Sequence, residues 1–280
     1  MEIIDTHMHL LYGQNFAYDW SAGIDVLKSQ DFSLQHYSEL AALAGVTVAI
    51  FMETAVNAKF SQAEAIFAKT KVDDNDTMVK GVIAGCFPEK KDGFEAWLAQ
   101  TGDAGYVGYR RILHTEPDEL SQSNIFIDNV KKIGAHHKCF DMCFAQRQLP
   151  LAIKLAKNCP NTQFILDHCG VPDIAGGDFG QWATDISNLA ELENVSCKIS
   201  GILAYVPGSK NAAQIIKPYV EHCIEAFGWN RVVWGGDWPV VNMASSLGEW
   251  VKISKALVST ESLSNQEKLF SKNTIRIYGL

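Results

Sequence analysis

The sequence predicts a (β/α)8 barrel that forms one domain over residues 1–280, and three observations support this fold class. Short apolar runs alternate with longer helix-like segments, as in a parallel sheet covered by helices. The length fits one such barrel, which commonly has about 250 residues. The first apolar run is followed by neither a G-x-G-x-x-G turn nor a P-loop, so the sequence does not favour a doubly wound nucleotide-binding sheet.

Eight segments are expected to form the strands. They are rich in Val, Ile and aromatic residues and are bounded by Gly, Pro, Asn or Asp. In chain order they are residues 3–7, 47–53, 79–86, 106–113, 140–145, 163–168, 195–200 and 231–236.

Helical patterns separate most of these segments. Gly45 ends the first pattern, as expected at a helix C-terminus. The tail, residues 265–280, is expected to close the outer ring. The other patterns cover residues 33–45, 63–71, 123–137, 149–160, 185–194 and 216–228.

Composition excludes several classes of protein. The net charge of −8 argues against binding to nucleic acid, which needs clustered Lys and Arg. No apolar stretch approaches the roughly 20 residues that span a bilayer. The seven cysteines are odd in number and include no C-x-x-C, which indicates buried free thiols. With no visible signal peptide, a cytoplasmic location is expected.

Polar residues recur where the predicted strands end. Active sites of parallel barrels form at the carboxyl ends of the strands, so we expect these side chains to share one site. They are His7 and His9, Glu53, Arg110 with His114 just beyond, Asp167 and His168, Lys198 and Ser200, and Asp237 and Trp238.

His7 and His9 lie two residues apart, and side chains alternate along a strand, so both rings would point to one face of it. Two imidazoles on one inward face suit a divalent metal such as Zn²⁺ or Mn²⁺. The pair alone fits surface residues equally well, but Asp237 at another strand end favours a metal site. Glu53 is a candidate fourth ligand. Asp5 is a candidate partner that orients a histidine, and Asp167 is expected to be structural.

The chain resembles the amidohydrolase superfamily, and within it the branch of metal-dependent hydrolases that includes sugar lactonases. The resemblance runs from residue 3 to the end. It is carried by H-x-H in "IIDTHMHL", D-H-x-G-x-P in "ILDHCGVPDI", K-x-S-G in "NVSCKISGI" and G-x-D-W-P in "FGWNRVVWGGDWPV", with further similarity in "VGYRRILH".

This resemblance implies a (β/α)8 barrel that opens a lactone ring of a sugar acid, such as fuconolactone or rhamnonolactone. His7 and His9 match metal ligands of the first strand. Asp237 matches a ligand that also moves the proton of water. His168 matches a residue that binds the metal in some members and the substrate or water in others.

Two departures from the superfamily pattern point to one metal ion, with Zn²⁺ as the expected metal and Mn²⁺ as an alternative. The fifth predicted strand, in "FDMCFAQRQ", has no histidine, and the fourth, in "GYRRILH", has no lysine to carry a second metal. Some lactonases of this branch work without a metal, so the resemblance also admits metal-independent catalysis.

The expected chemistry assigns a role to each remaining candidate. Asp237 would accept the proton of water and pass it to the leaving oxygen. Arg110, taken as the inward member of the Arg110–Arg111 pair, would hold the carbonyl oxygen or a hydroxyl group of the substrate. His114 and Lys198 are expected to contact the substrate, and Trp238 to wall the pocket or to pack under a loop.

Two alternatives to a lactonase stay open. One is a decarboxylase of the same superfamily that acts on an unsaturated or aromatic carboxylate. The other is a barrel that binds a sugar acid without turnover. In each case the partner is a small molecule, and the sequence leaves the oligomeric state open, a homo-oligomer included.

Overall fold

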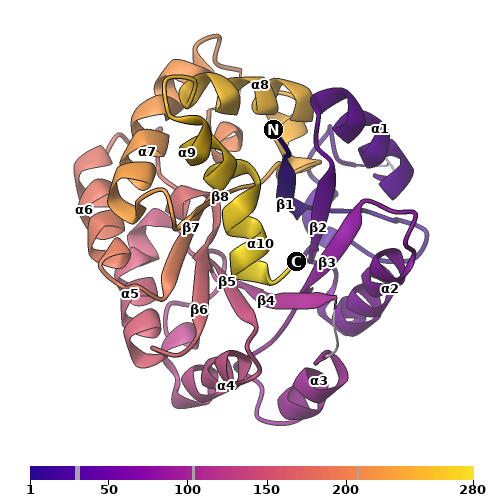
Figure 1. The fold of residues 1–280 in the computed structure, drawn as a ribbon. Coiled ribbons are helices and arrows are strands. Elements are labelled where there is room, and N and C mark those ends of the chain that lie inside the picture. Colours follow the sequence, from indigo (N-terminus) through magenta and orange to yellow (C-terminus); the bar gives the residue numbers. More distant parts are fainter. Residues whose placement is uncertain (29–31, 103–104, 207) are drawn as a thin grey trace.

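The computed structural model describes residues 1–28, 32–102, 105–206 and 208–280. Within them, eight parallel strands follow one another around a barrel in sequence order (Figure 1). The barrel closes where Asp237 N donates to His7 O and His9 N donates to Trp238 O, at 2.7 and 2.8 Å. The predicted (β/α)8 fold is therefore confirmed. The strands are β1 (Ile4–Met8), β2 (Val48–Met52), β3 (Val79–Gly85), β4 (Tyr106–Ile112), β5 (Cys139–Cys143), β6 (Gln163–Leu166), β7 (Val195–Ile199) and β8 (Val232–Trp234).

Helices surround the strands (Figure 1). Ser33, Ser123 and Ser246 each cap a helix by accepting a backbone N–H bond, which explains where α1, α4 and α8 begin. The helices are α1 (Leu34–Ala44), α2 (Ser61–Asp73), α3 (Phe94–Gln100), α4 (Asn124–Ala135), α5 (Leu149–Asn158), α6 (Phe179–Ala190), α7 (Ala212–Phe227), α8 (Leu247–Leu257), α9 (Leu263–Glu267) and α10 (Asn273–Tyr278).

The observed elements differ from the predicted ones in a few places. Helices α3 and α8 fall outside the predicted set, and α6 begins six residues before the predicted segment. Strands β6 and β8 are shorter than predicted, because the chain turns away from the sheet before His168 and Asp237. Among the described residues, no helix has the length and apolar character needed to cross a membrane.

The apolar core has two parts. Residues on the outer face of the strands pack against the helices, as Phe140 and Trp234 do. A smaller cluster includes inward-facing residues of several strands, such as Ile50, Ile83 and Ile165. Because apolar side chains occupy part of the barrel interior, the polar residues inside it lie in surroundings with little water.

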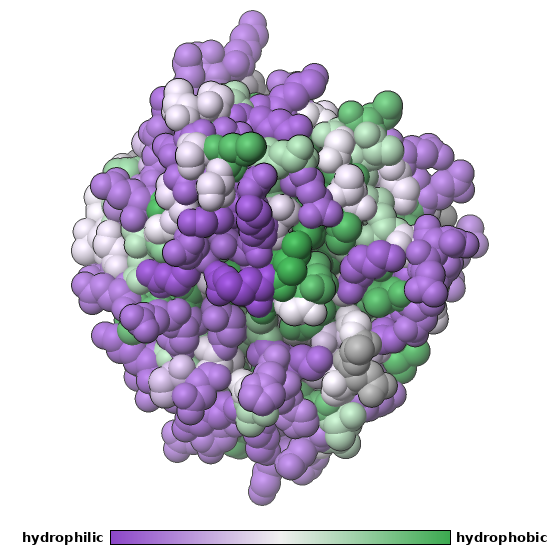
Figure 2. Space-filling model, in the orientation of Figure 1, coloured by the Kyte–Doolittle hydropathy of each residue, from purple (hydrophilic) through white to green (hydrophobic). Residues whose placement is uncertain are grey.

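The C-terminal helix α10 closes the end of the barrel opposite the carboxyl ends of the strands. Tyr278 belongs to the interior cluster, and Ile277 and Leu280 pack against it. In the view of Figure 1, α10 lies across the middle of the barrel. Apolar surface gathers near the middle of this face, while the surrounding rim is mostly hydrophilic (Figure 2). The site must therefore open at the other end.

Candidate active site

An irregularity in β1 directs both histidines inward. Asp5 pairs with Ala49 and Met8 pairs with Phe51, so β1 has one more residue than β2 over this stretch. The extra residue changes the alternation of faces between Asp5 and Met8. As a result the Asp5 side chain faces the helices, where it contacts Tyr37 of α1, and not the site. His7 and His9, beyond the irregularity, both turn toward Asp237, as predicted.

Asp5 joins the two strands that close the barrel. Its Oδ1 accepts hydrogen bonds from His7 N at 2.9 Å and Gly236 N at 2.7 Å, and its Oδ2 accepts one from Tyr37 OH at 2.7 Å. A side chain on residue 236 would collide with this carboxylate, since a Cβ there would lie 2.3 Å from Oδ2. Asp5 thus positions His7 through the backbone, which supports the orienting role considered from the sequence.

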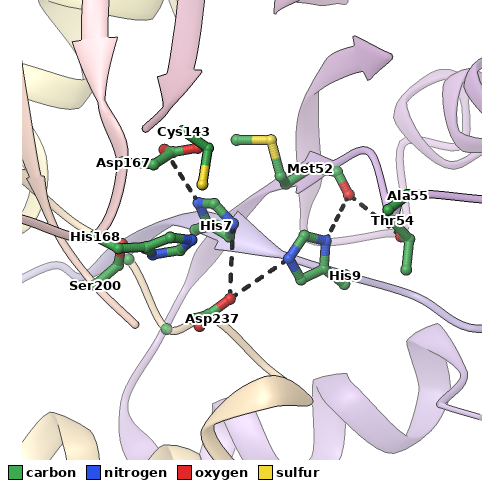
Figure 3. A network of polar contacts seen from close by, with 12 residues as sticks. His7, His9, Met52, Thr54, Ala55, Cys143, Asp167, His168, Ser200 and Asp237 are labelled. Atoms are coloured by element: carbon green, nitrogen blue, oxygen red, sulfur yellow. Dashed lines mark hydrogen bonds and ion pairs between the residues drawn. The ribbon is translucent and has the colours of Figure 1, made fainter. Parts of the chain in front are cut away.

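His7, His168 and Asp237 form a compact group of potential metal ligands. One donor atom from each lies within 4.8 Å of the others. His9 Nε2 lies 3.5 Å from Asp237 Oδ1, so four side chains converge (Figure 3). The other ring nitrogen of His9 lies 3.0 Å from the carbonyl oxygen of Met52. Because that oxygen can only accept, Nδ1 carries the proton and Nε2 offers its lone pair to the site.

His168 reaches the site through a tight turn after β6. Its φ of 54° lies in the left-handed region, and Ser200 Oγ lies 2.9 Å from its Nδ1. A Cβ on Gly201 would lie 2.3 Å from that nitrogen and 2.9 Å from Asp237 Oδ2. The glycine of K-x-S-G therefore leaves room for His168 and Asp237 to approach each other.

Burial changes the protonation of these groups. It raises the pKa of Asp237 to about 6 and lowers that of His9 to about 4. Burial also lowers the pKa of His168, although the nearby Asp237 charge opposes this shift. The imidazoles are therefore neutral near pH 7, as metal ligation requires, while Asp237 can exchange a proton near working pH.

Lys198 lies beneath the histidines and is fully buried. Its Nζ is 2.5 Å from Asp141 Oδ2, 3.0 Å from Asp167 Oδ1 and 3.3 Å from His7 Nδ1. These partners engage the ammonium group below the open end of the site. This placement favours a role in holding His7 and the carboxylates in position over the predicted contact with substrate.

Asp167, which the sequence reasoning placed at a strand end and expected to be structural, occupies a central position in the site. Its Oδ1 lies 3.5 Å from His7 Nδ1, and its Oδ2 lies 3.6 Å from Arg110 Nη1. Burial opposes ionisation, but Lys198 and His7 outweigh it and hold the pKa of Asp167 well below its usual value. The available signal was its place at the end of an apolar strand, directly before His168.

Arg110 points into the barrel and Arg111 points outward to Glu89 and Glu116, as predicted. Arg110 Nη1 lies 3.1 Å from His7 Nε2, and its Nε donates to Glu53 Oε1 at 2.7 Å. The other carboxylate oxygen of Glu53 accepts from Ala55 N. Both oxygens of Glu53 are thus engaged, which favours a salt bridge with Arg110 over the predicted metal ligation.

The remaining predicted contacts lie at different depths. His114 is partly buried, and its Nδ1 lies 3.2 Å from Cys143 Sγ. Trp238 is fully buried, with its ring packed against Phe32 and Tyr37. This packing favours the second alternative for Trp238, a ring that supports the loop after β8.

Cys143 is a further residue at the site that the sequence reasoning missed. It ends β5, and donor atoms of Cys143, Asp167 and His168 lie within 4.8 Å of one another. Figure 3 shows its sulfur beside His7 and Asp167. Cys143 lies two residues after Asp141 on β5, so both side chains point to the inner face of the strand. This spacing could have identified Cys143 from the sequence.

Two cavities lie among the segments that follow the strands at this end of the barrel. One of about 450 Å³ is lined by Glu53 and Arg110 together with residues that follow β3 and β4. Another of about 760 Å³ lies over the segments after β5 and β6 and reaches Tyr205. Both volumes suit a small organic molecule, since ligand pockets commonly measure about 300–1,000 Å³.

The family model for amidohydrolases matches residues 4–280. The chain belongs to the amidohydrolase family. This membership agrees with the resemblance that the sequence motifs indicate, and it covers the strand ends that supply every residue of the site.

Individual relatives of this amidohydrolase are distant in sequence. It is 25% identical to an L-fucono-1,5-lactonase from Burkholderia ambifaria, over 88% of this chain and 83% of the relative. A crystal structure of an amidohydrolase from Burkholderia multivorans with bound zinc has a TM-score of 0.90 at 21% identity, with both chains fully covered. A probable 2-pyrone-4,6-dicarboxylic acid hydrolase from Acinetobacter baumannii has a TM-score of 0.80 at 16% identity, again over both full chains.

The residues present fit one divalent metal ion. Imidazole nitrogen and carboxylate oxygen are ordinary zinc ligands, and His7, His168 and Asp237 bring them together in a buried place. The charge of Asp167 beside this group is already balanced, since its two oxygens lie 3.0 Å from Lys198 Nζ and 3.6 Å from Arg110 Nη1, respectively. Arg110 Nη1 faces His7 Nε2, so a metal ion at that nitrogen would compete with the arginine.

Proposed function

We propose that this amidohydrolase opens the lactone ring of a sugar acid by hydrolysis, with Asp237 as the group that moves the proton of water. The observation that carries the proposal is the position of the buried Asp237 carboxylate, 3.7 Å from His7 Nε2 and 3.5 Å from His9 Nε2, where burial raises its pKa to about 6. A proton acceptor with a pKa near the working pH is the most effective general base. The relative named as a lactonase supports the choice of substrate class.

The proposed cofactor is one divalent metal ion, with zinc preferred. His7, His9, His168 and Asp237 would hold it, and the zinc bound in the amidohydrolase from Burkholderia multivorans supports this assignment. When bound, such an ion polarises a carbonyl oxygen or lowers the pKa of water to about 7.

The side chains of this protein supply the proton transfers and the positioning. Asp237 accepts a proton from the attacking water and then gives it to the ring oxygen as the carbon–oxygen bond breaks, which yields the open hydroxy acid. Arg110 keeps its positive charge and has Nη1 beside His7, where it can stabilise negative charge on the substrate oxygen. His114, partly buried and beside Cys143, is proposed to contact the substrate hydroxyls.

Hydrolysis of a panel of aldonolactones, followed with a pH indicator, tests this proposal. Each ring opening releases acid, so the expected result is turnover of at least one member. A chelator should abolish this turnover, and added zinc should restore it. Failure to turn over any lactone, with carbon dioxide released from an unsaturated or aromatic carboxylate instead, would replace the lactonase with a decarboxylase. Binding of a sugar acid without either reaction would indicate a barrel that only binds.

A further inference from the structure

Three cysteine sulfur atoms converge on the outer side of the barrel, behind His168. Cys169 lies in the turn after β6, Cys197 lies in β7, and Cys223 lies in α7. The three sulfur atoms lie within 4.8 Å of one another, and all three residues are fully buried. We call this group, Cys169, Cys197 and Cys223, the three-thiol cluster.

The surroundings of the three-thiol cluster are apolar. All three residues belong to the core between the sheet and its covering helices, which also includes Trp182 and Val220. Cys169 Sγ contacts the carbonyl oxygen of Lys198 at 3.9 Å. Among the described residues, no ion pair links these sulfur atoms to a charged side chain. A ligand held here must therefore be satisfied by three sulfur atoms alone.

Geometry and charge together limit what the three-thiol cluster can hold. Bonds of about 2.3 Å from a central atom to sulfur place three sulfur atoms about 4 Å apart around a planar centre and about 3.4 Å apart around a pyramidal one. The three sulfur atoms, within 4.8 Å of one another, would therefore complete such a site by moving inward. Three thiolates carry three negative charges, and burial of net charge in an apolar core is costly. A trivalent centre that binds three thiolates cancels this charge completely.

We propose that the three-thiol cluster is a binding site for a trivalent thiophilic element of the arsenic and antimony class. In the reaction, As(OH)3 exchanges its three hydroxyl groups for the sulfur atoms of Cys169, Cys197 and Cys223. Three As–S bonds form while three As–O and three S–H bonds break. The three thiol protons leave with the hydroxyl groups as three water molecules, and no atom is oxidised or reduced.

Other thiophilic ions fit less well. Structural zinc sites almost always have four ligands, and the three-thiol cluster supplies three. Cu(I) accepts thiolate ligands readily, but three thiolates around a monovalent ion would leave two buried negative charges. The neutral arsenic complex avoids both penalties, and neutral As(OH)3 can enter the core during local opening without carrying charge through it.

Occupation of the three-thiol cluster would reach the active site through the backbone. Cys169 directly follows His168, and both have left-handed backbone angles in the same turn. Trp182 Nε1 donates to Cys169 O at 2.9 Å, which fixes this turn against α6. Movement of Cys169 Sγ toward Cys197 and Cys223 would therefore shift His168, so arsenite is expected to lower activity as well as to bind.

The test uses the full chain, reduced with a phosphine and incubated with arsenite, followed by gel filtration and native mass spectrometry. The expected result is one arsenic atom per chain with three hydrogens lost, and arsenic X-ray absorption that shows three sulfur neighbours. Single variants Cys169→Ala, Cys197→Ala and Cys223→Ala should each weaken binding at least tenfold. Alanine suits a helix, so Cys223→Ala is the variant expected to keep the fold best.

Matched variants separate the three-thiol cluster from other cysteines. Cys159→Ala, buried elsewhere in the core, and Cys143→Ala, at the active site, should bind arsenic as the unaltered protein does. Arsenite should raise the melting temperature of the unaltered protein relative to that of Cys223→Ala, because the folded three-thiol cluster binds arsenic more tightly than the separate thiols of the unfolded chain do. No retained arsenic in the folded protein, or retention lost in Cys143→Ala and unchanged in Cys223→Ala, would overturn the proposal.

Discussion

Asp167 and Asp237 are both buried carboxylates, yet their environments affect ionisation in opposite directions. Lys198 Nζ lies 3.0 Å from Asp167, and although burial opposes ionisation, the charge of Lys198 keeps the pKa of Asp167 well below its usual value. Within the part of the chain that the structure describes, the ion-pair partners of Asp237 are imidazole nitrogens at 3.5 and 3.7 Å, and burial raises its pKa to about 6. A fixed cation therefore decides which carboxylate stays charged and which can exchange a proton.

The difference separates two layers of the barrel interior. The lower layer, made of Asp141, Asp167, Lys198 and Tyr278, is a network of ion pairs and hydrogen bonds that positions His7 from below. The upper layer, made of His7, His9, His168 and Asp237, carries the proposed chemistry (Figure 3). Changes in the lower layer should mainly alter stability, and changes in the upper layer should mainly alter catalysis.

The largest expected change in stability comes from Lys198→Met, which removes the cation of the lower layer. It leaves Asp141 and Asp167 buried without their partner, and loss of one member of a buried ion pair typically costs about 3–5 kcal/mol. The free energy of unfolding, measured in urea, should fall by this amount.

A surface lysine provides the matched control. Lys217 pairs with Glu221 on α7, and both side chains are more than half exposed, so Lys217→Met should leave the unfolding midpoint nearly unchanged. Equal effects of the two substitutions would contradict the view that Lys198 holds the lower layer together.

Glu64 tests the rule that a buried acid without a cation becomes neutral. Burial raises its pKa from 4.5 to about 8, so between these values the folded state keeps a proton that the unfolded state has lost. Stability should fall as the pH rises through this range. Glu64→Gln, which cannot ionise, should therefore exceed the unaltered protein in unfolding free energy by a few kcal/mol at pH 8, with little difference at pH 5.

Urea unfolding of Glu64→Gln and of the unaltered protein at pH 5 and pH 8 measures the difference in their unfolding free energies. A variant advantage that grows from pH 5 to pH 8 supports the rule. An advantage that is the same at both values would show that Glu64 does not hold a proton in the folded state. Glu95→Gln is the control, since Glu95 is an exposed acid with a lysine partner.

A smaller effect is expected from Tyr278→Phe. The Tyr278 hydroxyl donates to Asp141 Oδ2 at 3.0 Å, and loss of this bond should cost about 1–2 kcal/mol of unfolding free energy. Lactone turnover should change less than twofold, because Tyr278 lies at the closed end of the barrel. Tyr219→Phe is the control, since no hydrogen bond of that hydroxyl occurs within the described residues. A large loss of turnover in Tyr278→Phe would contradict the separation of the two layers.

The sequence predicted the barrel because alternation of apolar runs and helical patterns is a local signal that repeats around the whole fold. It missed α3, which has only seven residues and so shows too few turns for a clear helical period. It placed the ends of β6 and β8 too late, because the left-handed backbone at His168 and Asp237 depends on packing around the site.

The sequence brought His7, His9, Arg110, His168 and Asp237 together correctly, since strand ends in a barrel meet at one face. It could not give the direction of Asp5, because an irregularity in pairing between β1 and β2 leaves no mark in one strand alone. Nor could it show that Lys198 and Glu53 face buried partners, which depends on residues far apart in the chain.

The most direct test of the central claim compares Asp237→Asn with Asp167→Asn in lactone turnover and in unfolding. The account predicts that Asp237→Asn lowers kcat by about 10²–10⁴-fold while the unfolding midpoint stays at or above that of the unaltered protein. Asp167→Asn should lower the midpoint, because Lys198 loses a charged partner. Full lactonase activity in Asp237→Asn would contradict the account.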